Sequence, residues 1–183
     1  MQQRHSGFRK AIDKGFFSYL GEKMIKMNKK MINLINKTNH AGSQLPKELE
    51  DLIDQGFVEE DGCFFIFSQF EKMTNASKSN FQDKTGHECF INSIHIDDFV
   101  KKDYIINSLL FVNSIFCKLP ADKNKIKAIV VADDAGALVK IHSIREGEFW
   151  IDDNLDEYAD AVFTAEFIDI FEISKIIESR SRI

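Results

Sequence analysis

The sequence lacks the common signatures of catalysis and cofactor binding. It contains no Gly-x-Ser-x-Gly, Gly-x-x-x-x-Gly-Lys-Ser/Thr, Gly-x-Gly-x-x-Gly or His-Glu-x-x-His pattern. These absences argue against a nucleophile-elbow hydrolase, a P-loop or dinucleotide-binding protein and a zincin. No apolar run approaches the roughly 18 residues that a membrane-spanning helix needs. We therefore expect a protein that is not an enzyme, holds no cofactor and has no membrane partner.

Cysteine is scarce, with only Cys63, Cys89 and Cys117 in the chain. Their odd number and wide separation favour neither a disulfide framework nor a zinc site. Each lies in an apolar run, which is typical of a buried free thiol, and free thiols persist in a reducing cytosol. The uncharged stretch from Gly15 to Gly21 is too short and polar for a signal-peptide core. These features predict a cytoplasmic protein.

Neither charge nor apolar content is extreme. The 183 residues carry a formal net charge of −5, and 44% of them are hydrophobic, which is the composition of a globular protein. The length suits a single domain, with a helical N-terminal part over 1–56 and a sheet-containing part over 57–183. An acidic total argues against direct binding of nucleic acid.

Helical spacing dominates the N-terminal part. Apolar residues recur every three or four positions from Phe8 to about Asn36, which predicts a helix that Gly15 and Gly21 weaken in its middle. Pro46 favours the start of a short helix, and Gly56 favours its end.

Strand and turn signals follow. Asp61-Gly62 predicts a hairpin turn, and the alternation from His87 to Ile96 predicts a strand. We expect Asp97 or Asp98 to cap the next helix, which ends before Pro120. A three-stranded meander is predicted over 126–132, 137–144 and 148–151. The stretch 164–178 fits both periods, with a weak preference for a helix. The expected fold is α+β, with N-terminal helices packed on a mostly antiparallel sheet and one long helix between strands.

One polar cluster suggests chemistry, and its members are His87, Glu88, His95, Asp97 and Asp98. On a strand, His87, His95 and Asp97 share a face, where they could hold a divalent metal or form a base with its orienting partner. This alternative predicts a metal- or His-dependent hydrolase. The favoured interpretation is structural, with His95 in a half-buried strand and the aspartates as helix caps. A thiol nucleophile at Cys89 is disfavoured, because adjacent strand residues point to opposite faces.

Charge is distributed unevenly along the chain. Met1–Lys47 has ten basic and two acidic residues, whereas Ala128–Ile183 has five basic and thirteen acidic residues. The favoured interpretation of the lysines of the N-terminal part is a solvated polar face of an amphipathic helix. Alternatively, they could bind nucleic acid or anionic lipid, or pair with the acidic half of the same molecule. They are Lys10, Lys14, Lys23, Lys26, Lys29, Lys30 and Lys37.

The densest acidic block surrounds aromatic residues, which are the usual anchors of interfaces. We predict that it is a docking surface for a basic protein, since a rim of one charge sign steers a partner of the opposite sign. The alternative is a solvated acidic loop with Trp150 in the core. The predicted docking residues are Glu146, Glu148, Trp150, Asp152, Asp153, Asp156, Glu157, Tyr158 and Asp160.

The stretch Gly86–Asp98 (GHECFINSIHIDD), followed by an apolar helix and an acidic meander, resembles contact-dependent growth-inhibition immunity proteins. The resemblance implies a stoichiometric inhibitor that binds a cognate toxin domain. Such toxins are commonly nucleases with basic clefts, which an acidic surface would occlude. No functional residue transfers with the resemblance, because these proteins share no active-site signature.

Overall fold

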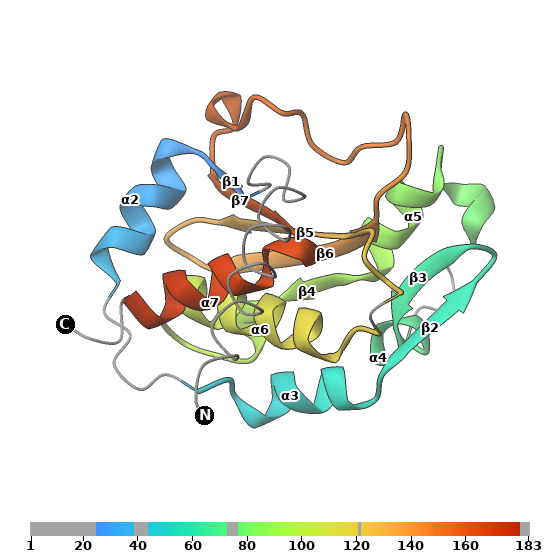
Figure 1. Ribbon diagram of the computed structural model, residues 1–183, viewed down its shortest axis with the longest axis horizontal. Coiled ribbons are helices and arrows are strands. Elements are labelled where there is room, and N and C mark those ends of the chain that lie inside the picture. Colours follow the sequence, from blue (N-terminus) through green and yellow to red (C-terminus); the bar gives the residue numbers. More distant parts are fainter. Residues whose placement is uncertain (1–24, 39–43, 73–76, 121, 180–183) are drawn as a thin grey trace, which may run out of the picture.

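The computed structural model describes residues 25–38, 44–72, 77–120 and 122–179. Within them the chain forms a five-stranded sheet of order β1-β7-β5-β6-β4 and a separate two-stranded hairpin, β2–β3. Every neighbouring pair of strands is antiparallel, and helices accompany both sheets (Figure 1). The expected α+β class is confirmed.

The element bounds, in chain order, define the labels used below. The strands are β1 (Lys26–Met27), β2 (Phe57–Glu60), β3 (Cys63–Ile66), β4 (Ser93–His95), β5 (Ile126–Ala132), β6 (Ala137–Ser143) and β7 (Ala161–Glu166). The helices are α2 (Lys29–Lys37), α3 (Lys47–Asp54), α4 (Phe67–Phe70), α5 (Lys84–Ile91), α6 (Tyr104–Lys118) and α7 (Ile170–Ser179). Short 3-10 turns are η1 (Lys78–Asn80), η2 (Ile96–Asp98), η3 (Leu155–Glu157) and η4 (Phe167–Asp169).

The main core lies between one face of the large sheet and α6. Alternate strand residues such as Val130 and Phe163 are buried together with Val112 and Phe116 of α6, as the period-two pattern of a half-buried strand requires. In the view of Figure 1, α3, α6 and α7 lie below the sheet, and the chain between β6 and β7 arches above it. No helix among the described residues is long and apolar enough to cross a membrane.

Several elements predicted from local signals are confirmed. The short helix α3 begins after Pro46 and ends before Gly56, and α6 ends before Pro120. Asp61 and Gly62 both have positive φ angles, 53° and 71°. Two positive φ angles are the mark of a type I′ turn, whose twist matches that of the paired strands.

The N-terminal helix prediction is confirmed over Lys29–Lys37 and wrong at Lys26 and Met27. Lys26 and Met27 form β1, which pairs with Thr164 and Phe163 of β7. The helix begins only after Asn28, whose side chain accepts a hydrogen bond from the N–H of Met31. This cap ends the extended segment and starts α2. The rest of the prediction, over residues 8–24, lies outside the described residues.

The strand predicted from His87 to Ile96 is wrong over most of its length. Asp83 caps α5 by accepting a hydrogen bond from the N–H of Gly86, and only Ser93–His95 is extended. Because α5 buries polar and apolar residues on several sides, among them His87, Glu88 and Cys89, its sequence lacks a clear helical period.

Two further predictions need correction. Asp97 and Asp98 belong to η2 and do not cap the long helix α6. That helix begins after Asp103, which has a left-handed backbone conformation with φ of 59°. The third meander strand is β7, whereas the predicted strand 148–151 contributes only an isolated bridge between Arg145 and Glu148. The C-terminal stretch is a strand up to Glu166 and then becomes η4 and α7.

Candidate functional site

All the predicted docking residues lie in the segment 144–160, which we call the β6–β7 connection. It forms the long loop at the top of Figure 1. Phe149 and Trp150 lie in it side by side in sequence, with 69% and 42% of their surface exposed. The alternative that placed Trp150 in the core is therefore wrong. Contiguous exposed apolar surface often marks a site of interaction with another molecule. The adjacent pair Phe149 and Trp150 is therefore a candidate interaction surface.

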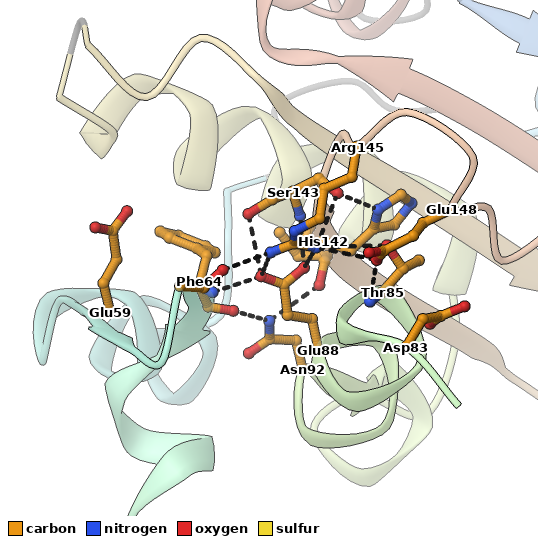
Figure 2. A network of polar contacts seen from close by, with 12 residues as sticks. Glu59, Phe64, Asp83, Thr85, Glu88, Asn92, His142, Ser143, Arg145 and Glu148 are labelled. Carbon is orange, nitrogen blue, oxygen red and sulfur yellow. Dashed lines mark hydrogen bonds and ion pairs between the residues drawn. The ribbon is translucent and has the colours of Figure 1, made fainter. Parts of the chain in front are cut away.

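Arg145 anchors the start of the connection to a buried carboxylate. Its Nη2 and Nη1 atoms donate hydrogen bonds to Oε1 and Oε2 of Glu88, at 2.6 and 2.9 Å. Glu88 has no exposed surface, and Figure 2 shows it at the centre of the network. Paired N–H groups aligned with both carboxylate oxygens make the strongest kind of side-chain ion pair. The hydrogen bond to Glu88 raises the pKa of Arg145 further.

Glu88 of α5 and Asn92, which caps the C-terminal end of α5, complete this polar network. Glu88 also accepts hydrogen bonds from the N–H of Phe64 and from the N–H and hydroxyl of Ser143. One turn later, the amide of Asn92 accepts from Ile66 and donates to the carbonyls of Phe64 and Ile141. Since these partners lie on β3 and β6, α5 joins the small hairpin to the large sheet. We interpret Glu88 as a structural residue, because its bonding capacity is used within the chain.

Glu148 makes a second attachment to α5. Its Oε2 accepts hydrogen bonds from the N–H and the hydroxyl of Thr85, both at 2.9 Å (Figure 2). Burial acts to raise the pKa of Glu148, but the Thr85 hydrogen bonds and the nearby Arg145 outweigh it and lower the pKa. Glu148 thus faces the first turn of α5, where a carboxylate is favoured.

Residues next to α2 hold the other end of the connection. The Asn28 amide donates to the carbonyls of Leu155 and Asp160 and accepts from the N–H of Val162. Lys26 pairs with Asp153 at 2.6 Å, and Lys29 pairs with Asp156 at 3.7 Å. Lys30 donates to the carbonyl of Ala159. For Lys26 and Lys29, the prediction that basic residues pair with the acidic half of the molecule is confirmed, whereas Lys30 bonds a backbone carbonyl.

The connection is also braced internally. The hydroxyl of Tyr158 accepts a hydrogen bond from the N–H of Asp152 at 2.8 Å, and Asn154 donates to Glu157. The remaining carboxylates in the predicted set, Glu146, Asp152 and Asp160, are exposed. The structure therefore leaves Glu146 and Asp152 on either side of the exposed aromatic pair, and uses Glu148, Asp153 and Asp156 in contacts within the chain.

The second predicted cluster is not assembled. His95 and Asp97 line an open pocket of about 270 Å³, together with Asp133 and Asp160. His87 instead stacks on the ring of Phe81, with centroids 4.9 Å apart, and does not line that pocket. Among the described residues, no group of three or more His, Cys, Asp and Glu side chains could hold a metal ion.

Two buried groups near this cluster, the Cys89 thiol and the His87 ring, are held in their neutral forms. Burial raises the pKa of Cys89 to about 12, so the thiolate that a nucleophile needs is not formed at neutral pH. His87 is 7% exposed, and neither ring nitrogen has a hydrogen-bond partner among the described residues. Burial lowers the pKa of His87 and favours the neutral ring.

The structure adds two residues that sequence reasoning missed, Lys140 and Arg145. The ammonium of Lys140 lies 5.0 Å from the ring centroid of Trp150, and Arg145 binds Glu88 as described. Both are isolated basic residues in the most acidic part of the chain. Their isolation among acidic residues is the feature of the sequence that could have singled them out.

Comparison with known proteins places the chain in a family. The family model described as "Uncharacterized protein PM0498 family" matches residues 26–178. A curated relative, "Uncharacterized protein PM0498" of Pasteurella multocida (strain Pm70), is 34% identical over 141 residues, which is 68% of this chain and 87% of the relative. No solved structure matches the chain. The matched range begins at β1 and ends within α7, so it includes the whole β6–β7 connection. This chain belongs to the PM0498 family.

Proposed function

We propose that this protein is an immunity-type inhibitor, which binds a basic bacterial toxin domain through the β6–β7 connection. One observation carries the proposal: Phe149 and Trp150 are exposed on a loop that is fixed at both ends and flanked by free carboxylates. The sequence resemblance to contact-dependent growth-inhibition immunity proteins points the same way.

The anchoring of the connection favours binding over catalysis. A loop that is ordered before it meets its partner loses little conformational entropy on binding. Arg145 and Glu148 fix the loop next to β6, and Asn28 fixes it next to β7. The aromatic pair between these anchors supplies the large side chains that dominate interface energetics.

The charge around the aromatic pair favours a basic partner. Glu146 and Asp152 are exposed, and exposed carboxylates raise the association rate of a positively charged protein. A nuclease toxin needs a basic cleft to bind its polyanionic substrate. An acidic, aromatic loop seated in that cleft would exclude the substrate without any chemistry of its own.

The proposal is tested with the product of the gene that lies immediately upstream. That product is expressed in bacterial cells with and without this protein, and growth and complex formation are measured. We expect protection of the cells, a stable complex, and a Kd that rises with salt concentration because screening weakens the charge attraction. A wild-type protein that neither binds the upstream product nor protects the cells would overturn the proposal.

A charge-reversed variant locates the surface. Replacing Glu146→Lys and Asp152→Lys should weaken binding at least about tenfold, which corresponds to about 1.4 kcal/mol. The matched control, Glu48→Lys with Glu178→Lys, reverses two exposed carboxylates on α3 and α7. It should bind as the wild type does, since its net charge changes equally, but α3 and α7 lie on the other side of the large sheet from the connection (Figure 1).

A further inference from the structure

Lys140 lies beneath the exposed tryptophan. Its ammonium donates hydrogen bonds to the carbonyl of Cys89 at 2.9 Å and to the hydroxyl of Ser93 at 3.0 Å. These partners belong to the end of α5 and to β4, so two neighbouring elements fix the position of the cation. The third neighbour of the ammonium is the ring of Trp150, 5.0 Å away at its centroid.

This arrangement fixes the indole as well as the lysine. A cation over the face of an indole is attracted by the negative potential of the ring, and most strongly when the cation is removed from water. Lys140 is partly buried, and that burial lowers its pKa. The ring therefore replaces part of the hydration that the ammonium has lost.

The cation also determines which partner group suits Trp150. One face of the ring is occupied by Lys140, yet 42% of the surface of Trp150 is exposed, and the preceding residue, Phe149, is 69% exposed. A second cation on the outer face would be repelled by the first across the ring. Apolar groups meet no such repulsion, and the neighbouring Phe149 extends the apolar surface.

We propose that Lys140 is a positioning residue, which holds Trp150 as an apolar anchor for the partner. The partner then presents an apolar pocket to Trp150 and Phe149, and its basic groups meet the carboxylates at the edge of the pocket. The inference has two halves. The docking half, that the partner binds Trp150 in an apolar pocket, rests on the proposed inhibitor function. The positioning half, that Lys140 holds Trp150 in place, concerns contacts within the chain only.

The positioning half is tested by fluorescence, because Trp150 is the single tryptophan of the chain. Lys140→Met removes the cation and keeps a long side chain, whereas Lys140→Arg keeps the cation. Acrylamide quenching of Trp150 should increase roughly twofold in Lys140→Met, since 42% of the side chain is exposed in the wild type and release exposes the rest. Lys140→Arg should resemble the wild type.

A titration of the wild-type protein gives a second measurement, which is independent of whether Lys140→Met folds. Loss of the ammonium proton should change the emission of Trp150 at a pH below the ordinary lysine pKa of 10.5. Lys140→Arg should not show this transition, because arginine stays charged. Unchanged quenching in a folded Lys140→Met, or a wild-type titration with no emission change that Lys140→Arg lacks, would overturn the positioning half.

The docking half is tested with the same upstream-encoded toxin domain. Lys140→Met and Trp150→Ala should each weaken binding at least about tenfold, and Lys140→Arg should restore it. Phe171→Ala is the control, since Phe171 is an exposed aromatic residue on α7, away from the connection. If Lys140→Met frees Trp150 yet binds the toxin normally, the docking half is wrong while the inhibitor function stands. If the wild type binds no toxin, the inhibitor function and the docking half both fail, and the fluorescence still decides the positioning half.

Discussion

The substitution Glu88→Gln tests whether the buried network joins the two sheets. The carboxylate accepts five hydrogen bonds, from Phe64, from the N–H and hydroxyl of Ser143, and from two nitrogens of Arg145. An amide of the same shape has only one accepting oxygen. Whichever way it turns, its NH₂ group faces at least two donors, and Arg145 loses its closest counter-charge, while Glu148 remains at 3.7 Å.

The cost follows from that geometry. Removing one partner of a buried ion pair lowers the free energy of unfolding by about 3–5 kcal/mol. Glutamine keeps some of the hydrogen bonds, so we expect about 3 kcal/mol. With a urea m-value of about 2–3 kcal/mol/M, the midpoint of unfolding should fall by about 1–1.5 M.

Equilibrium unfolding in urea, followed by far-UV circular dichroism, measures the shift. Glu59→Gln is the control, because it makes the same chemical change in an exposed ion pair, between Glu59 and Lys123. Glu59 lies on the β2–β3 hairpin, to which the buried network attaches at Phe64. The midpoint of this variant should stay close to that of the wild type. If Glu88→Gln lowers the midpoint no more than Glu59→Gln does, the reasoning about the network is refuted.

Two further predictions concern stability. Burial lowers the pKa of His87 below 6.5, so the unfolded chain binds the proton more readily and stability falls as pH drops below 6.5. His87→Phe should reduce the slope of the free energy of unfolding against pH, to which a buried histidine contributes up to about 1.4 kcal/mol per pH unit. Urea unfolding at several pH values measures this slope, and an unchanged slope would contradict the prediction. A Cβ at Gly136 would lie 2.4 Å from Oδ1 and 2.6 Å from Cγ of Asp97, so Gly136→Ala should cost about 1–3 kcal/mol. Adding Asp97→Ala should restore most of that loss, and a double mutant that is merely additive would show that the two positions are independent.

Local signals predicted the parts of the fold that local chemistry decides. Asp61-Gly62 requires a turn because both residues take positive φ, and Pro46 begins a helix that Gly56 ends. The errors occur where tertiary contacts decide the backbone. Lys26 and Met27 continue a helical pattern in sequence but pair with β7, more than 130 residues away. No local signal distinguishes those outcomes.

The same limit applies to the candidate site. The block of acids and aromatics correctly located an exposed connection, because Trp150 and its neighbours lie in it. Sequence could not show that Glu148 faces Thr85 or that Asp153 pairs with Lys26. These contacts bring together residues from distant parts of the chain. The sequence shows how many carboxylates the acidic block carries, whereas the fold decides which of them are paired within the chain.

That distinction changes which force should dominate the proposed interface. In the part of the chain that the structure describes, Glu146 and Asp152 are the carboxylates beside the aromatic pair that form no ion pair. Exposed rim charges contribute about 0–1 kcal/mol each. Phe and Trp side chains bury about 150–250 Å² each. With 69% and 42% of their surfaces exposed, and about 25 cal/mol per Å², Phe149 and Trp150 offer upper limits of about 4 and 2.5 kcal/mol. The aromatic pair therefore outweighs the charges in affinity, while the carboxylates act mainly on the rate of encounter. An inhibitor of this kind binds its partner mainly through apolar contacts at the mouth of a basic cleft. Its negative charge, which resembles that of a polyanionic substrate, acts mainly on the association rate.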